Sequence, residues 1–185
     1  MGSNAAGIYV LDSLGRIKEV TGSVGGGGGG SVGDLKNIKF IRKTADESVT
    51  SSTTLQNDDH FFLAISSNEV WTIEAHLFVT GGTTGDFQWA FNVPSGATGW
   101  NTGIRLDSNA ITPTADVALS AIEDLTDTGF RVSGTASPTV HVQVNAIVIN
   151  SSNSGNIQFR WAQNFSSATP TTIEAGSFMI FSRWT

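Results

Sequence analysis

The chain has 185 residues, of which 39% are hydrophobic and 14% are charged, and its formal net charge at pH 7 is -6. This length suits one domain of ordinary size with a short appendage and is too short for two full catalytic domains. A nucleic-acid-binding protein needs a basic patch to displace counterions from phosphates, so an acidic chain with scattered Lys and Arg predicts no nucleic-acid partner.

The uncharged residues indicate the fold class. Ser, Thr and Gly occur 21 times each, and strong helix formers are scarce, which favours strands and turns and predicts an all-β protein. The chain has no Cys, which excludes disulfides, thiol catalysis and Cys-ligated zinc. No segment approaches the roughly 18 apolar residues that span a bilayer, and the first residues lack the basic start of a signal peptide, so we expect no membrane insertion.

The first predicted element is a strand, turn, strand unit within residues 1–24. Two strands alone are marginal in water, so we expect this hairpin to be an arm that docks on a partner or a sister subunit. The alternative is that the hairpin folds back on its own domain. The apolar residues expected to anchor the arm are Ile8, Tyr9, Val10, Leu11, Ile17 and Val20.

Residues 25–33 form the clearest boundary in the chain. Six consecutive glycines, Gly25 to Gly30, bury no side chain and lose the most backbone entropy on ordering, so this segment is interpreted as a flexible linker. The remaining residues, 34–185, are then predicted to form the main domain.

Strand signals recur through the first half of this domain. They include Ile38–Arg42 and Phe61–Ile65, the second bounded by the turn residues Asp58 and Asp59. Val70–Thr80 alternates with a period of two, as expected for a strand with one buried face, and Phe87–Val93 alternates in the same way.

The second half is less uniform. Residues 97–126 give only weak signals, and the later segments return to clear strand patterns. Eight to ten short strands with frequent turns and no helix longer than two turns predict an antiparallel sandwich or jelly roll. The expected strands are Ile104–Leu106, Asp116–Ala121, Phe130–Val132, Val140–Ile149, Ile157–Phe165 and Gly176–Trp184.

Four hydrophobic segments together carry a resemblance to a known group of proteins. They are Phe61–Ile65, Trp71–Ala75, Phe87–Pro94, and the ending Phe159–Gln163 followed by Thr172–Phe178. This series resembles tailed-bacteriophage virion proteins with a C1q/TNF-like jelly roll, which occur as head fibres, capsid decorations and tail appendages. The resemblance covers about residues 38–184 and implies a homotrimer whose N-terminal segment attaches to a phage capsid or tail protein. The glycine run has no Gly-X-Y period, so a collagen stalk like that of C1q is not expected.

The aromatic content gives a physical reason to consider the trimer. Five Trp and eleven Phe are many for a body of this size, and large exposed apolar patches usually mark interfaces. We predict Phe159, Trp161 and Phe178 as contributors to the trimer interface. The alternative for each ring is that it fills the sandwich core.

No motif in the chain indicates catalysis. The three histidines lie in different predicted strands, and only Asp58-Asp59-His60 groups a histidine with carboxylates, at an expected turn, so no metal site is predicted. No P-loop is present. We therefore expect no enzyme activity and no cofactor.

Three functions of different kinds fit these observations to different degrees. The favoured one is a trimeric virion structural protein of the capsid-decoration or head-fibre type, made in the cytoplasm of the bacterial host and attached through its N-terminal arm. The second is a tail-fibre or appendage protein that binds host surface glycans, with Trp100 and Asn101 as candidate contacts. The third is a secreted signalling ligand of the TNF or C1q kind, which the missing signal peptide argues against.

Overall fold

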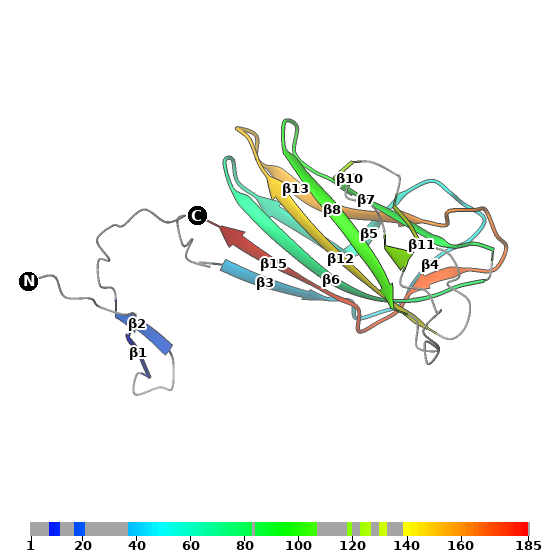
Figure 1. Ribbon diagram of the computed structural model, residues 1–185, viewed down its shortest axis with the longest axis horizontal. Coiled ribbons are helices and arrows are strands. Elements are labelled where there is room, and N and C mark those ends of the chain that lie inside the picture. Colours follow the sequence, from blue (N-terminus) through cyan, green and yellow to red (C-terminus); the bar gives the residue numbers. More distant parts are fainter. Residues whose placement is uncertain are drawn as a thin grey trace, which may run out of the picture. The chain divides into compact units, whose positions relative to one another are not determined.

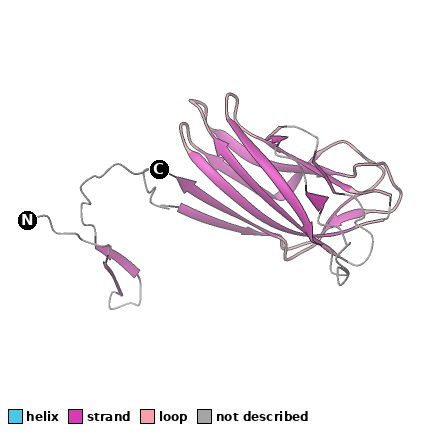
Figure 2. Cartoon of the chain, viewed as in Figure 1, coloured by secondary structure: helices cyan, strands magenta, loops and turns pink. Residues whose placement is uncertain are grey.

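The computed structural model describes residues 8–11, 17–20, 37–82, 84–106, 118–119, 123–126, 130–132 and 139–184. The chain divides into two compact units, Met1–Val32 and Gly33–Thr185. Every regular element in the described residues is a β-strand, which confirms the predicted fold class (Figure 2). Within these ranges there is no helix of the length and apolarity needed to cross a bilayer.

The first unit contains a two-stranded antiparallel sheet. Strand β1 (Ile8–Leu11) pairs with β2 (Ile17–Val20), and Ile8 lies opposite Val20. This pairing agrees with the strand, turn, strand unit expected from the sequence. The predicted linker, residues 25–33, lies outside the described residues.

The second unit contains a nine-stranded sheet, called here the larger sheet (Figure 1). Strand β6 lies at its centre. It pairs with β12 along one side, and along its other side it pairs with β15 and then β14. The strands of this sheet are β3 (Asn37–Arg42), β4 (Glu47–Val49), β6 (Val70–Thr80), β8 (Thr98–Leu106), β9 (Ala118–Leu119), β10 (Glu123–Asp124), β12 (Val140–Ile149), β14 (Thr171–Ile173) and β15 (Phe178–Trp184).

A four-stranded antiparallel sheet, the smaller sheet, completes the sandwich. Its order is β11-β7-β13-β5, with β5 (Gln56–Ile65), β7 (Phe87–Asn92), β11 (Phe130–Val132) and β13 (Gly155–Ala162). All pairings in both sheets are antiparallel, and the arrangement is compatible with a jelly roll.

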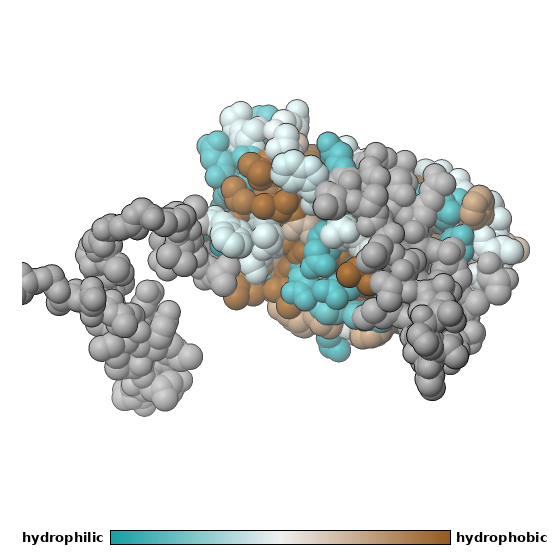
Figure 3. All heavy atoms as spheres, viewed as in Figure 1, coloured by the Kyte–Doolittle hydropathy of each residue, from teal (hydrophilic) through white to brown (hydrophobic). Residues whose placement is uncertain are grey.

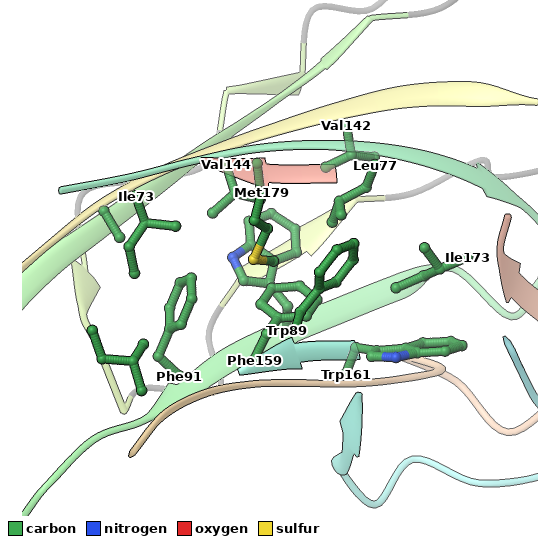
Figure 4. Close-up of a cluster of buried hydrophobic side chains, with 14 of the residues drawn as sticks. Ile73, Leu77, Trp89, Phe91, Val142, Val144, Phe159, Trp161, Ile173 and Met179 are labelled. Atoms are coloured by element: carbon green, nitrogen blue, oxygen red, sulfur yellow. The ribbon is translucent and has the colours of Figure 1, made fainter. Parts of the chain in front are cut away.

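The core lies between the two sheets (Figure 4). In β6 and β12 every second side chain is buried, as the alternating sequence predicts, and these side chains meet the rings of β7 and β13. Trp89 is one of these rings and lies directly against Gly103 of β8. A Cβ atom at position 103 would lie 2.4 Å from the indole, so only glycine leaves room for the ring.

The structure differs from the sequence-based expectation mainly at polar segments. Strand β5 begins at Gln56, so Asp58 and Asp59 lie inside a strand and not at a turn. The reason is that the Asp58 side chain is buried and contacts the ammonium group of Lys43, a partner that is distant in sequence. The short strands β4 and β14 were not predicted from the sequence, because their few residues are rich in Ser and Thr.

Candidate interaction face

The surface of the larger sheet that points away from the core is the outer face. Residues paired across neighbouring strands lie on the same side of a sheet, so the register defines this face. Its apolar members are Ile38 and Phe40 on β3, Phe178, Ile180 and Trp184 on β15, Val70 and Phe78 on β6, Ile147 and Ile149 on β12, and Trp100 and Ile104 on β8.

The outer face carries most of the exposed large apolar side chains in the described part of the chain. Of the eight with the highest exposure, six lie here, and Phe40 is 60% exposed. Hydrophobic patches are visible between polar atoms in the space-filling view (Figure 3). Among the described side chains of this face the charged ones are Arg42, Glu74 and Asp124, so the surface is apolar and poor in charge, which is typical of a protein interface.

Five rings form a continuous row across four strands of this face, called here the aromatic row. Phe40 packs on Phe178 with ring centroids 5.2 Å apart, and Phe178 packs on His76 at 4.7 Å. His76 lies beside His141, which in turn lies 5.6 Å from Phe78. The row joins β3, β15, β6 and β12 and presents flat, rigid surfaces that lose little side-chain entropy on contact.

The two histidines of the row share a hydrogen bond. Nδ1 of His76 lies 3.0 Å from Nε2 of His141, and Nε2 of His76 lies 2.9 Å from a carboxylate oxygen of Glu74. Because one of the two facing nitrogens must act as the acceptor, the pair cannot be doubly protonated without losing this bond. Burial lowers the pKa of His141, and the neighbouring His76 lowers it further. The neutral form of His141 is therefore favoured on this face.

Two shallow hollows lie on the outer face. The first, of about 270 Å³, is bordered by Trp100, Thr102, Asn145 and Ile147. The second, of about 240 Å³, lies on the other side of Asn145 and is bordered by residues of β6 and β15. Both combine apolar side chains with amide or hydroxyl groups.

The residues predicted for the trimer interface separate into two groups. Phe159 and Trp161 have no exposed surface and point into the core from β13 (Figure 4), so their predicted role as interface contacts is wrong. They are buried because β13 alternates, with Gln158 and Arg160 on its outer side. Phe178 lies on the outer face within the aromatic row, and its role at an interface stays a prediction.

The two candidate glycan contacts also differ from each other. Trp100 is 55% exposed beside the first hollow. Asn101 is buried: its Oδ1 accepts a hydrogen bond from Trp89 Nε1, and its Nδ2 donates to the carbonyl of Asp124. The oxygen and the nitrogen of this amide both form hydrogen bonds within the protein, so the expectation that Asn101 contacts a sugar is wrong.

The six residues predicted to anchor the arm lie on β1 and β2. Their attachment to a partner stays a prediction.

A second polar group lies beneath the surface, at the end of β3. The structure brings Glu47 and His60 within 4.8 Å of Asp58, although the sequence suggested only the local Asp58-Asp59-His60 trio. The ammonium of Lys43 lies 2.7 Å from Asp58 and 2.5 Å from Glu47, so a lysine already supplies the positive charge that these carboxylates need. Sequence reasoning missed Lys43 and Glu47, because nothing local to either residue shows that it is buried.

Comparison with known proteins gives little further information. No protein-family model and no curated protein matches the chain. Three solved structures of infectious bursal disease virus show weak similarity. The Gx strain structure has 8% identity and a TM-score of 0.22, covering 80% of this chain and 36% of that chain. The Gt strain structure has 8% identity and a TM-score of 0.22, covering 94% and 41%.

The third is the crystal structure of the VP2 subviral particle, with 9% identity, a TM-score of 0.23, and coverage of 96% of this chain and 44% of that chain. The chain thus spans less than half the length of each of these viral proteins. TM-scores this low carry no argument about family or function, and the matches give no support for a bacteriophage or C1q/TNF origin.

Proposed function

We propose that the protein is a non-enzymatic structural component of a bacteriophage particle, of the capsid-decoration or head-fibre type, that assembles as a homotrimer. The observation that carries this proposal is the outer face of the larger sheet, with its aromatic row and low charge. The resemblance of the sequence to phage virion proteins with jelly-roll domains is the reason for proposing a phage particle as the location and a trimer as the assembly.

The composition of the face favours a second copy of the same chain as its occupant. Interfaces between identical subunits are more apolar than transient ones, and aromatic residues are enriched in them. The described charged side chains of the face are one arginine, Arg42, and two carboxylates, Glu74 and Asp124, so rotated copies can place Arg42 opposite a carboxylate. Because each chain carries a net charge of -6, copies repel each other at long range, and apolar contact has to supply the attraction.

The hairpin of β1 and β2 would attach the trimer to the particle. A two-stranded sheet is marginal by itself, and docking on a capsid or tail protein would stabilise it. Three arms on one trimer raise the effective concentration of the second and third contacts, so weak docking sites together give lasting attachment.

The molar mass in solution tests the trimer. We would measure it by light scattering on the full chain and on a shortened chain that begins at Ser31. Both are expected at three times the chain mass, which would leave the arm free to bind the particle. If both chains are monomers, the proposal is contradicted. If the full chain is a trimer and the shortened chain is a monomer, the subunits meet through the arm and not through the outer face.

A second function, binding of host surface glycans, rests on Trp100. An exposed indole beside a hollow with the polar groups of Thr102 and Asn145 offers a ring for stacking and hydrogen bonds for hydroxyls. A glycan array with the wild type and Trp100→Ala separates the two roles. Lost glycan binding with unchanged mass would favour the sugar site, whereas a lower molar mass would place Trp100 in the subunit interface.

A further inference from the structure

A buried lysine with two carboxyl groups lies where the two sheets meet. Lys43 follows β3 of the larger sheet, and Asp58 belongs to β5 of the smaller sheet. The side chains of both residues have no exposed surface, and Nζ of Lys43 lies 2.7 Å from Oδ2 of Asp58. An amine at that distance is also close to the carboxyl carbon that carries this oxygen, as a reaction between the two groups requires.

The backbone holds Lys43 in this position. Its N–H donates to the carbonyl of Ser177, and its carbonyl accepts from Gly176. The Phe61 ring lies 5.3 Å from Nζ and covers the ammonium group. The lysine side chain therefore cannot move away to water, as most lysines do.

The carboxyl group of Asp58 is oriented by an irregularity in β5. The register between β5 and β13 shifts between Gln158 and Arg160, and this bulge frees two backbone N–H groups, those of His60 and Phe61. Both donate to Oδ1 of Asp58 at 2.9 Å. Two such donors stabilise negative charge that develops on a carbonyl oxygen when a nucleophile attacks the attached carbon.

The third group, Glu47, is placed to carry a proton. Its Oε2 lies 2.5 Å from Nζ of Lys43 and accepts the N–H of Asp59. Burial raises the pKa of Glu47, the hydrogen bond with Lys43 opposes this, and the negative charge of Asp58 raises it further. A carboxyl group of this kind can exchange a proton with the amine and with the neighbouring carboxyl group.

The charges of the cluster give the reaction a driving force. One ammonium and two carboxylates removed from water carry a large desolvation cost, which their mutual attraction offsets only in part. Condensation of the lysine with one carboxyl group would remove two buried charges at once.

We propose that Lys43 and Asp58 join in an intramolecular amide bond, formed by the protein itself with Glu47 as the proton carrier. Glu47 first passes one proton from the Lys43 ammonium to Oδ2 of Asp58. The neutral Nζ then attacks Cγ of the Asp58 carboxylic acid to form the C–N bond, and Oδ1 takes up the negative charge. Glu47 accepts a proton from the nitrogen and returns it to Oδ2, the C–Oδ2 bond breaks, and one water leaves. The amine and the carboxylic acid become an amide and water, Glu47 ends as it began, and neither oxidant nor reductant is needed.

The bond would supply a covalent link in a chain that has no cysteine. It would join β3 of the larger sheet to β5 of the smaller sheet and close a loop between positions 43 and 58. Such a loop restricts the unfolded chain, as a disulfide does. The Trp161 indole, which donates to Oδ2 at 3.2 Å, covers the site on the core side and shields the amide from hydrolysis.

Mass spectrometry of the intact, denatured full chain tests the proposal. The expected mass is lower than the sequence mass by one water, and proteolysis should release a branched peptide in which Lys43 is joined to Asp58. An unchanged mass for the folded wild type would overturn the proposal. A water loss confined to a linear peptide, as in a cyclised aspartate, or a link from Lys43 to Glu47, would overturn it equally.

Two variants test the role of Glu47. Glu47→Gln keeps the size and hydrogen-bonding shape of the side chain but cannot carry the proton, so the full sequence mass is expected from folded protein. The matched control is Glu69→Gln, which alters another partly buried glutamate beside a cation, Arg183, and should keep the water loss. Complete linkage in Glu47→Gln would contradict the proton-carrying role.

Discussion

The outer surfaces of the two sheets differ, although both sheets bury the same kind of side chains between them. On the smaller sheet the outward side chains of β13 are polar and bond to their own domain: Gln158 donates to the carbonyls of Asp58 and Phe61, and Arg160 donates to that of Leu55. On the larger sheet the outer face carries the aromatic row and few charges. The outward side chains of β13 are thus bonded within the chain, whereas the outer face of the larger sheet exposes a row of apolar rings that contact with another molecule would bury.

The difference also shows that aromatic content alone does not locate an interface. Phe159 and Trp161 are as large as the rings of the outer face, yet they fill the core. What distinguishes the two sets is the side of the sheet on which they lie, and substitutions on each side can test that distinction.

The largest effect is expected in the core. Replacing Trp161 with Ala leaves a cavity and removes the indole hydrogen bond to Asp58, so the free energy of unfolding should fall by about 3–5 kcal/mol. Chemical denaturation followed by fluorescence measures this loss. If Trp161→Ala keeps its free energy of unfolding but has a lower molar mass in solution than the wild type, Trp161 contacts another subunit and the core assignment is wrong.

A smaller effect is expected from pH, through His141 of the aromatic row. The unfolded chain binds a proton at His141 near the ordinary pKa of 6.5, whereas the folded chain binds it only at lower pH. Stability should therefore be constant above this pH and fall as the pH decreases through the folded pKa. Urea midpoints at about pH 7.5 and about pH 5 measure the change, and the difference should be smaller in His141→Gln. An equal pH dependence in this variant would show that other groups cause it.

The smallest effect is expected on the outer side of the smaller sheet. Phe62 is 47% exposed there, so Phe62→Ser should change the free energy of unfolding by no more than about 0.5 kcal/mol and leave the molar mass unchanged. Denaturation and light scattering on the same sample test both statements. A dissociated Phe62→Ser variant would mean that copies meet through the smaller sheet.

The sequence predicts the fold well where the alternation is long. Val70–Thr80 and Val140–Ile149 match β6 and β12, because a period of two over ten or more residues is specific to a strand with one buried face. The alternation of β13 held a further signal: Gln158 and Arg160 between the rings already indicate that Phe159 and Trp161 point inward. That signal would have corrected the predicted interface.

The sites themselves depend on pairings that the sequence does not reveal. Phe40 contacts Phe178 only because β3 pairs with β15, and these strands are the first and last of the second unit in sequence order. In the same way Asp58 suggested a turn, since its partner Lys43 lies fifteen positions earlier and nothing local shows that both are buried. Contacts between distant residues therefore decide both the outer face and the lysine cluster.

The central claim is that copies of the chain meet through the outer face of the larger sheet. The most direct test is the molar mass of Phe40→Glu and Phe62→Glu, measured by light scattering at one concentration beside the wild type. Both variants place a carboxylate at an exposed phenylalanine, one on each sheet. The account predicts that Phe40→Glu dissociates to the monomer while Phe62→Glu remains trimeric. A trimeric Phe40→Glu beside a dissociated Phe62→Glu would contradict it.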